Sequence, residues 1–299
     1  MKARMKRVVN IVAPILIAIG LVVLFWFLIA GKQIDVLEPT GQVARAQHSI
    51  LVFTTILSAA VVIPVFGLLI YFSVKYRAGN TKARYRPDWS ENRTLESIWW
   101  GIPILIIGVL AVVTYQTSHS LDPYRAIEGG EPLEVQVVAL QWKWLFIYPE
   151  QQVATLNHLP IPVDRPVRFT MTAQAPMSAF WIPSLGSQIY AMNGMQSQLN
   201  LKAGKIGDYT GYTTNINGEG YAKMKFRTRV MSKTDFADWI VASAKSTAQM
   251  NATTYEKLAK PVSETDERTY RLTDAQLFDS LGADAGHGHQ QHHQGGHDS

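Results

Sequence analysis

Three long runs of apolar residues without a charged side chain dominate the first part of the chain. They extend from Val8 to Ala30, from Ser49 to Val74 and from Ser97 to Thr117, and hold 23, 26 and 21 residues. About 20 helical residues span the hydrocarbon core of a bilayer, so each run is long enough to cross a membrane. The alternative is a buried helix of a soluble protein, but such helices rarely run this long without one charge. We therefore predict membrane-spanning helices at the second and third runs.

The first run allows two interpretations. Four basic residues within the tip 1–7 precede it, as in a signal peptide, yet the run exceeds the usual apolar length of about 7–15 residues. It ends in a sequence that resembles a bacterial lipoprotein cleavage box, with Lys32 at the position of the lipid-bearing cysteine. Without that thiol no lipid can be attached there. An uncleaved span is favoured over a signal segment that is cleaved after Gly31.

The charged residues between the runs indicate an orientation. The tip 1–7 carries no acid, and the loop 75–93 carries six basic residues against two acidic ones, whereas the segment 31–48 is balanced. Because basic loops remain on the cytoplasmic side, the tip and the loop are expected in the cytoplasm. Everything after Thr117 is then expected outside.

The pattern changes from about Glu131 onward to short segments that alternate between apolar and polar residues. Residues 133–138 and 167–172 alternate in this way, and Gly and Pro residues separate such segments over about 100 residues. Several short strands with regular turns favour a β-sandwich or β-barrel. After Val230 the spacing of apolar residues becomes helical, and a second amphipathic stretch ends near 257–261.

The end of the chain is rich in histidine. Five of the eight His lie in the tail 282–299, namely His287, His289, His292, His293 and His297. Such a tract can bind a divalent metal weakly. A solvated tail without a bound metal is the favoured interpretation.

Together these patterns predict an α+β membrane protein. The parts expected are an N-terminal signal or anchor span with an external linker (1–48), a transmembrane helical hairpin with a basic loop (49–117), an external β-domain (118–230), a C-terminal helical extension (231–281) and the His-rich tail (282–299).

Composition and charge narrow the chemistry. The formal net charge is +5, but residues 1–117 hold 12 Lys and Arg against 5 Asp and Glu, while residues 118–299 hold 16 against 18. The positive charge therefore records membrane topology, and no nucleic acid is expected as a partner. The chain has no Cys, which excludes disulfides, thiolate metal sites and a cysteine nucleophile.

Four stretches carry a resemblance to a known family. They are Leu95-Glu-Ser-Ile-Trp-Trp-Gly-Ile-Pro103, Gln141-Trp-Lys-Trp144, Phe180-Trp-Ile-Pro-Ser-Leu-Gly186 and Gly207-Asp-Tyr-Thr-Gly211. With two membrane helices and an external β-domain, the chain resembles subunit II of the haem-copper respiratory oxidases over residues 35–260. The resemblance implies a cupredoxin-like β-barrel, in agreement with the strand pattern.

In family members that oxidise cytochrome c, the resemblance implies a dinuclear copper centre held by two His, two Cys, a Met and a backbone carbonyl. These positions fall here on Ser178, Thr213, Asn215, Asn217, Tyr221 and Met224. Only the Met is retained, and hydroxyls and amides cannot replace the thiolates that bridge two coppers. The chain is therefore expected to bind no metal and no other cofactor. The other external histidines, His48, His119 and His158, are too scattered to assemble a site.

The chain is similar to the quinol oxidases of this family, of the cytochrome bo type, which lack that copper. The runs 187–196 and 142–150 carry this closer likeness. It implies a non-catalytic subunit of a proton-pumping oxidase that transfers electrons from ubiquinol to O₂ in the bacterial inner membrane. The haems and copper are then expected in subunit I, the main partner, with other oxidase subunits and membrane lipid around the chain and the outer domain in the periplasm.

Three aromatic or acidic residues invite specific roles. Trp142 and Trp144 correspond to an electron-entry region of the copper-containing relatives, but core packing or contact with another subunit is favoured here. The family places a Glu at the position of Glu96 at the entrance of a proton path of subunit I. The alternative is an acid that is stabilised at a helix N-terminus, with Thr94 as the cap.

Two rival functions remain to be tested. One is a copper-containing cytochrome c oxidase subunit II, which the missing ligands argue against. The other is a membrane-anchored module that binds or delivers copper through the His-rich tail.

Overall fold

The computed structural model describes residues 20–21, 23–24, 26–28, 30–31, 34–77, 79–81, 91–263 and 265–281. The chain divides into two compact units, residues 1–38 and residues 39–299. The basic tip 1–7, most of the first apolar run, residues 82–90 of the basic loop and the His-rich tail lie outside the described residues. The fold below is that of the second unit.

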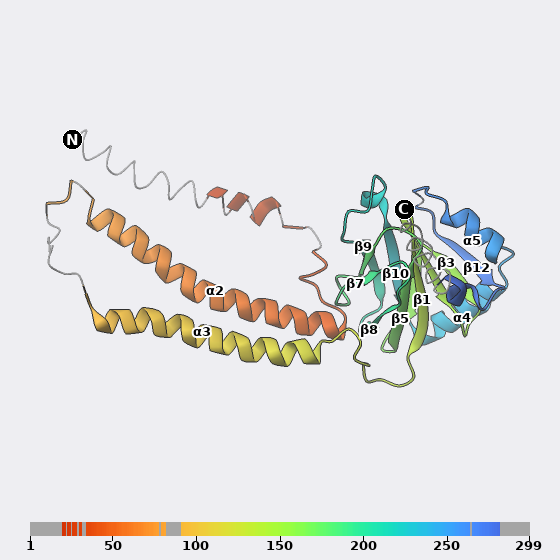
Figure 1. The fold of residues 1–299 in the computed structure, drawn as a ribbon, viewed down its shortest axis with the longest axis horizontal. Coiled ribbons are helices and arrows are strands. Elements are labelled where there is room, and N and C mark those ends of the chain that lie inside the picture. The colour runs from red at the N-terminus through yellow and green to blue at the C-terminus, as the bar shows by residue number, and fades with distance from the viewer. Residues whose placement is uncertain are drawn as a thin grey trace, which may run out of the picture. The chain divides into compact units, whose positions relative to one another are not determined.

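Two long helices follow the second and third apolar runs (Figure 1). Helix α2 extends over Gln42–Lys75 and helix α3 over Arg93–Ser120, and among the described residues these two are long and apolar enough to cross a membrane. Their apolar side chains point outward all round, and Ile63 and Leu105 are each 69% exposed. A helix that is hydrophobic on every side requires lipid or other helices around it. The two predicted spans are therefore confirmed as helices, and both continue into the flanking polar residues.

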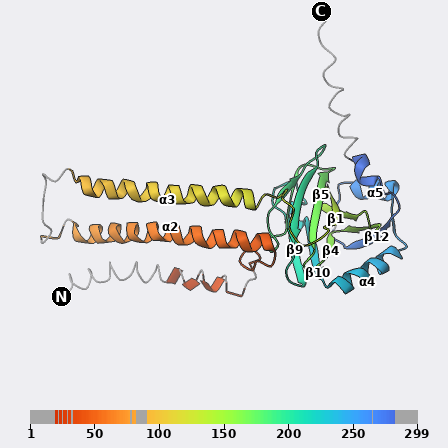
Figure 2. The ribbon, with the colours of Figure 1, turned by 90° about the horizontal axis from the view of Figure 1, so that it is seen from below.

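One face of each helix is less exposed than the rest. The half-buried positions on α3, Ile106, Leu110, Val113 and Thr117, recur every three or four residues. On α2 the same spacing holds for Val43, Ala46, Ile50, Thr54 and Leu57, while half-buried His48 and Ala59 fall outside it. That spacing follows one side of an α-helix. Figures 1 and 2 both show the helices side by side, as expected for a hairpin.

Backbone amides just before α2 and in its first turn donate hydrogen bonds to the β-domain. The carbonyl oxygen of Ser184 accepts from the amides of Thr40 at 2.8 Å and Gly41 at 2.9 Å, and the carbonyl of Leu185 accepts from Ala44 at 3.1 Å. A helix N-terminus needs such acceptors, which a capping side chain usually provides. Gly41 has no room for a side chain, because a Cβ there would lie 2.2 Å from the oxygen of Leu185.

The outer domain consists of two β-sheets. The larger contains β11 (Gln249–Met250), β12 (Arg268–Leu272), β3 (Val153–Leu156), β2 (Lys143–Tyr148), β1 (Leu133–Leu140), β5 (Pro166–Ala173) and β8 (Ser197–Lys202), in that spatial order. The smaller contains β4 (His158–Pro162), β10 (Lys225–Met231), β9 (Gly207–Thr213), β6 (Ser178–Trp181) and β7 (Ile189–Ala191). Most neighbours pair antiparallel, whereas β1–β5, β4–β10 and β11–β12 pair parallel.

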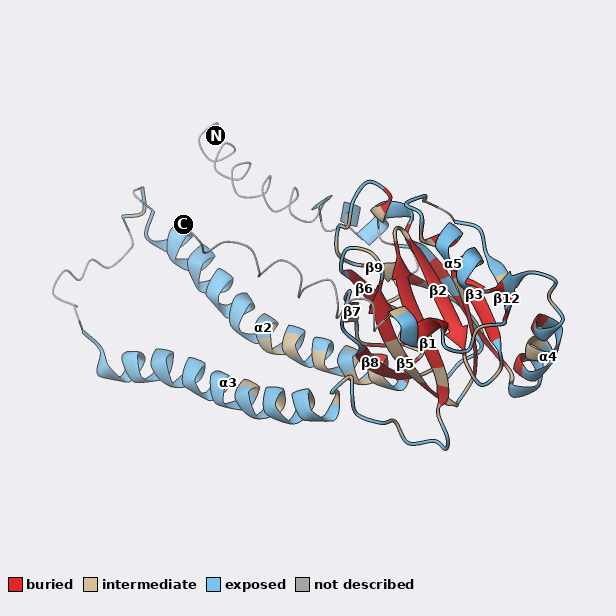
Figure 3. Cartoon of the chain, turned by 45° about the vertical axis from the view of Figure 1, so that its right-hand side comes forward, coloured by how far each residue is buried: buried red, intermediate tan, exposed pale blue. Residues whose placement is uncertain are grey.

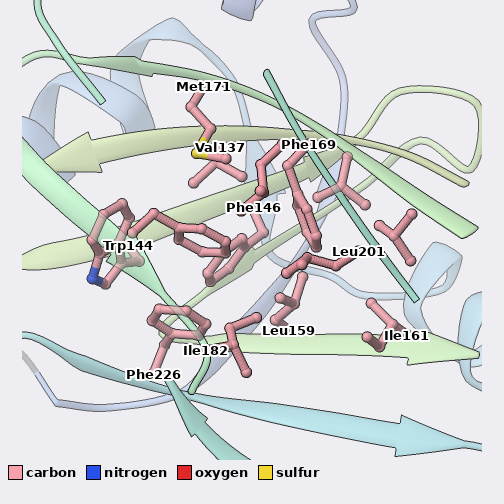
Figure 4. Packing of buried hydrophobic residues seen from close by; sticks show 14 of the residues in the cluster. Val137, Trp144, Phe146, Leu159, Ile161, Phe169, Met171, Ile182, Leu201 and Phe226 are labelled. Carbon is pink, nitrogen blue, oxygen red and sulfur yellow. The ribbon is translucent and has the colours of Figure 1, made fainter. Parts of the chain in front are cut away.

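Buried residues lie along the strands (Figure 3), and an aromatic core fills the space between the two sheets (Figure 4). Trp144 and Phe146 of β2 face Phe226 of β10, and Phe180 of β6 stacks on Phe226 with ring centroids 5.1 Å apart and planes 7° apart. Gly211 leaves room for this ring, since a Cβ at that position would lie 2.0 Å from Phe226. Rings packed between two sheets each bury a large apolar area.

Part of the C-terminal extension covers the other face of the larger sheet, while Phe236 joins the core between the two sheets. It contains the predicted helices, α4 (Lys233–Ala244) and α5 (Ala252–Ala259), and in addition the strands β11 and β12, which were not predicted. β12 pairs antiparallel with β3, and Tyr255, Leu258 and Tyr270 pack in a second core cluster against strands β1–β3. The alternation that predicts a strand is present at 268–272, but it is only five residues long.

Candidate functional site

The six positions that correspond to copper ligands come from β6, the end of β9 and the loop that joins β9 to β10. Strand β6, which begins at Ser178, pairs with β9 at Phe180 and Thr213. This pairing places Ser178 near the end of β9. The short 3-10 helix η1 (Tyr221–Lys223) then leads to Met224, and the amide of Thr213 donates to the carbonyl of Met224 at 3.4 Å. Sheet pairing thus gathers residues that are up to 46 positions apart.

The amide of Asn217 joins three of these positions. Its Nδ2 donates to Ser178 Oγ at 2.8 Å and to Met224 Sδ at 3.2 Å. Ser178 and Met224 are both buried, and Ser178 Oγ donates onward to the carbonyl of Pro176 at 3.1 Å. A metal ion binds to lone pairs of its ligands. Here the N–H group of Asn217 already occupies lone pairs of the Ser178 hydroxyl and the Met224 thioether.

Asn215 holds a second part of the same end of the domain. Its Oδ1 accepts from the backbone amide of Ala179 at 2.6 Å and from Thr213 Oγ1 at 3.1 Å, and its Nδ2 donates to the carbonyl of Met177. These bonds connect the loop after β9 to both sides of β6. Together with Asn217 they form a polar network that gives partners to the hydroxyls of Ser178 and Thr213, while Asn217 Oδ1 is buried without a partner within the described residues.

Tyr221 does not join this network. Its backbone closes the turn, since its amide donates to Gly218 and its carbonyl accepts from Met224. Within the described residues its side chain forms no hydrogen bond with the other five positions. Side-chain hydrogen bonds therefore involve five of the six positions, whereas Tyr221 is joined to Met224 through the backbone alone.

The donor set does not fit a copper centre. It offers one thioether, two hydroxyls and two amides, of which Asn217 and Asn215 both use their N–H groups within the network. Copper in such a site requires thiolate or imidazole ligands. Across the described part of the chain, no group of three or more His, Asp or Glu side chains lies close enough to hold a metal ion.

Trp142 covers the loop between β9 and η1. Its indole Nε1 donates to the carbonyl of Asn217 at 3.2 Å, and its ring lies so close to Gly220 that a Cβ there would be 2.3 Å away. Its φ of 62° is in the left-handed region, which is costly for a bulky residue and persists only when surrounding contacts require it. Sequence reasoning missed this conformation, although Gly218 and Gly220 were visible as signs of a close approach.

Trp144 has a different place from its neighbour. It is fully buried and meets Phe180 and Phe226 edge to face, with centroids 5.4 and 5.8 Å apart. The structure thus places Trp144 in the core, as the sequence interpretation favoured. Its backbone pairs with Asn157, whose Oδ1 accepts from the Trp144 amide at 2.9 Å.

The three external histidines lie on different elements. His48 is on α2 and His119 is near the end of α3, where its Nδ1 contacts the carbonyl of Tyr115 at 2.8 Å. His158 begins β4, and its two ring nitrogens contact the carbonyl of Leu156 and the hydroxyl of Thr269, each at 3.2 Å. Burial lowers the pKa of His158, so its neutral form is favoured.

Glu96 lies in the first turn of α3 and is exposed in this chain. The helix cap is Asn92, whose Oδ1 accepts from the amide of Leu95 at 3.0 Å, so the sequence prediction of Thr94 as the cap was wrong. An acid in the first turn interacts favourably with the helix dipole. That interaction needs no proton pathway, and both roles of Glu96 remain compatible with its position.

Comparisons with known proteins cover most of the chain. A family model described as the cytochrome c oxidase subunit II periplasmic domain matches residues 149–230. Ubiquinol oxidase subunit 2 of Acetobacter aceti is 47% identical over 237 residues, which cover 78% of this chain and 77% of that protein. Cytochrome bo(3) ubiquinol oxidase subunit 2 of Pseudomonas putida is 44% identical over 235 residues (78% and 75%), and quinol oxidase subunit 2 of Bacillus subtilis is 35% identical over 267 residues (88% and 83%).

Proposed function

The chain belongs to the family of quinol oxidase subunits II within the haem-copper oxidases, and from this premise we propose that it is the metal-free outer subunit of a proton-pumping ubiquinol oxidase of a bacterial inner membrane. Its partner, subunit I, carries the haems and the copper and receives electrons from ubiquinol directly. The cupredoxin-like domain, in the periplasm, then has no electron to pass on. Its role is to cap the complex from outside and to keep the membrane hairpin in place.

The observation that supports this proposal most strongly is the Asn217 amide, which donates to both Ser178 and Met224. A polar network at the former ligand positions stabilises the loops without a metal. Electron transfer through this domain would need a redox centre that these residues cannot hold. The relatives named as ubiquinol oxidases, at 47% and 44% identity, favour ubiquinol as the electron donor.

Metal analysis of the full chain tests the proposal. The chain with and without residues 282–299 is titrated with copper, and bound metal is counted after gel filtration. We expect weak binding through the His-rich tail at most, and none in the shortened chain. Tight stoichiometric copper in the shortened chain would support the rival functions, a copper-containing cytochrome c oxidase subunit or a copper-delivery module, and would overturn the proposal.

A second part of the proposal concerns Glu96, which we assign to the entrance of a proton pathway that continues in subunit I. Its exposed carboxylate at the start of α3 supports this role, because an entrance group must exchange protons with water. In the purified oxidase, Glu96→Ala should slow turnover by about tenfold. This is less than the ~10²–10⁴-fold loss expected when a positioned catalytic acid or base is removed, because water can take over part of the proton transfer.

The matched control for Glu96 is Glu91→Gln, which removes an exposed acid just before the same helix. Turnover and proton uptake are compared at equal haem content, which reports assembly. If Glu96→Ala assembles normally and turns over at the normal rate, the role of Glu96 is to stabilise the N-terminus of α3 and not to take up protons. Loss of turnover in both variants would point to a general charge effect.

A further inference from the structure

A cavity of about 450 Å³ lies where the outer ends of the two membrane helices meet the β-domain. Its polar lining comes from both helices, from the segment after α3, from the loop between β6 and β7 and from β8: Gln42, Ser120, Asp122, Arg125, Glu128, Ser187 and Asn200. None of these residues belongs to the polar network at the former ligand positions. The cavity is therefore a separate feature.

The side of the cavity at Ser120 lies at the level of lipid headgroups. Gln42 is seven residues before the charge-free run that starts at Ser49, and Ser120 is three residues after the run that ends at Thr117. At a rise of ~1.5 Å per residue, the cavity begins ~5–10 Å beyond the hydrocarbon core. The headgroup region extends roughly 5–7 Å beyond that core on each side of a bilayer, so it includes the side of the cavity at Ser120, whereas the side at Gln42 lies at its outer edge.

The segment that forms one wall is held in shape by the β-domain. The carbonyl of Pro123 accepts from the backbone amide and the side-chain amide of Asn200, at 3.0 and 3.1 Å. Lys202 Nζ donates to the carbonyl of Glu128 at 3.3 Å, and Asp122 Oδ1 accepts from the amide of Tyr124 at 2.9 Å. A wall fixed on both sides of Arg125 loses little freedom when a ligand binds.

The charges in the cavity have both signs. Arg125 provides a guanidinium, and Asp122 and Glu128 provide carboxylates. Within the described residues, neither the guanidinium of Arg125 nor the carboxylate of Glu128 takes part in a hydrogen bond or ion pair. A guanidinium matches the oxygens of a phosphodiester, and carboxylates accept hydrogen bonds from an ammonium group.

We propose that this cavity binds the headgroup of a zwitterionic phospholipid that ends in a primary ammonium, as in phosphatidylethanolamine. Arg125 binds the phosphodiester, and Asp122 and Glu128 bind the ammonium. A choline headgroup has no N–H to donate to the carboxylates, and an anionic headgroup brings no cation to them. The inference depends on the membrane-spanning hairpin and not on the electron donor of the oxidase.

Photo-crosslinking in the assembled oxidase tests the proposal. A p-benzoylphenylalanine at position 126, within the cavity lining, is activated in nanodiscs that contain equal amounts of phosphatidylethanolamine, phosphatidylcholine and phosphatidylglycerol. Mass spectrometry then identifies the adducts on this chain. We expect phosphatidylethanolamine to dominate by about tenfold, the ratio that one charge-assisted hydrogen bond gives.

Two substitutions sharpen the test, each with a matched control on the outer domain. Arg125→Gln and Glu128→Gln should each lower the phosphatidylethanolamine adduct by about tenfold, while Arg229→Gln and Glu256→Gln, at exposed sites away from the cavity, should leave it unchanged. Haem content and yield verify assembly of each variant. Equal adducts from the three lipids, an unchanged adduct in the cavity variants, or a crosslink to another oxidase subunit would overturn the proposal.

Discussion

The outer domain and the membrane hairpin use similar apolar residues in opposite ways. In the outer domain, Phe180 and Phe226 are buried between two sheets, whereas Ile63 and Leu105 on the hairpin face outward. The difference arises from the solvent that each region meets, because water drives apolar groups together and lipid does not. Hydrophobicity alone therefore does not say which side of an element is its interior.

The polar side chains differ in the same two regions. On the helices, Thr54 Oγ1 donates to the carbonyl of Ile50 at 2.9 Å and Thr117 Oγ1 to that of Val113 at 2.7 Å, each four residues back. In the outer domain, Asn217 and Ser178 are 39 residues apart and bond directly. Lipid provides no hydrogen-bond partners, so polar groups there use their own helix, whereas the sheets bring distant partners together.

The strongest test of this comparison removes an aromatic ring from the outer core. Phe226→Ala should lower the free energy of unfolding by about 3–5 kcal/mol, since the cavity that remains is enclosed by Phe180, Trp144 and Phe146. Denaturant unfolding of the full chain in detergent, followed by near-UV circular dichroism, measures the change. Ile216→Ala is the control, because that side chain is 81% exposed. Equal effects of the two substitutions would contradict the assigned core.

A smaller effect is expected from the polar network. Asn217→Ala removes the donor to Ser178 and Met224 and should cost about 1–2 kcal/mol. The cost is limited because Asn217 Oδ1 is buried without a partner within the described residues, so its removal relieves part of the loss. Asn193→Ala, at an exposed turn, is the matched control. A stabilised Asn217→Ala variant would show that the network does not hold the loops.

The pH dependence of stability tests a second buried polar group of the outer domain, the imidazole of His158. The pKa of His158 is lowered by burial from its ordinary value of 6.5, so the unfolded chain binds the proton more readily. The free energy of unfolding should therefore fall as the pH drops from about 6.5 toward the lower pKa of the folded state, and stay level above that range. His158→Gln should remove this slope in denaturant titrations, and the exposed His119→Gln should keep it. An unchanged slope in His158→Gln would assign the effect to other groups.

The smallest effect is expected on the hairpin. Ile63→Ala removes a large side chain that is 69% exposed, and it should change the stability of the outer domain by less than about 0.5 kcal/mol. The same unfolding experiment in detergent measures it, beside Phe226→Ala. A loss as large as that of Phe226→Ala would mean that Ile63 lies in an interior of this chain, and the comparison between the two regions would fail.

Local patterns predicted much of the fold. The two helices were recognised from charge-free runs, and β1 and β5 from alternation at 133–138 and 167–172, because these signals depend on neighbours in the chain. β12 was missed, since five residues after two helices carry little signal and its partner β3 lies more than 100 positions earlier. The cap of α3 was assigned to Thr94, yet Asn92 holds it, as helix boundaries are set by geometry within a few residues.

The candidate site shows the same division. The six former ligand positions were identified through the family resemblance, and their residue types already excluded thiolate and imidazole ligands. That Asn217 donates to both Ser178 and Met224, and that Tyr221 stays outside the network, depends on the pairing of β6 with β9. The strained backbone of Trp142 likewise depends on how close Gly220 comes to its ring.

The sequence by itself determined which segments can lie in a membrane, that no cysteine is available for a metal or a lipid, and which family the chain resembles. These properties follow from composition and short-range order. Only the tertiary structure decided that the carbonyls of Ser184 and Leu185 bind the backbone at the start of α2, that β12 extends the larger sheet, and that Asn200 lines one cavity with the segment 122–128. Each of these depends on groups distant in the chain, and only sheet register and packing bring such groups within bonding distance.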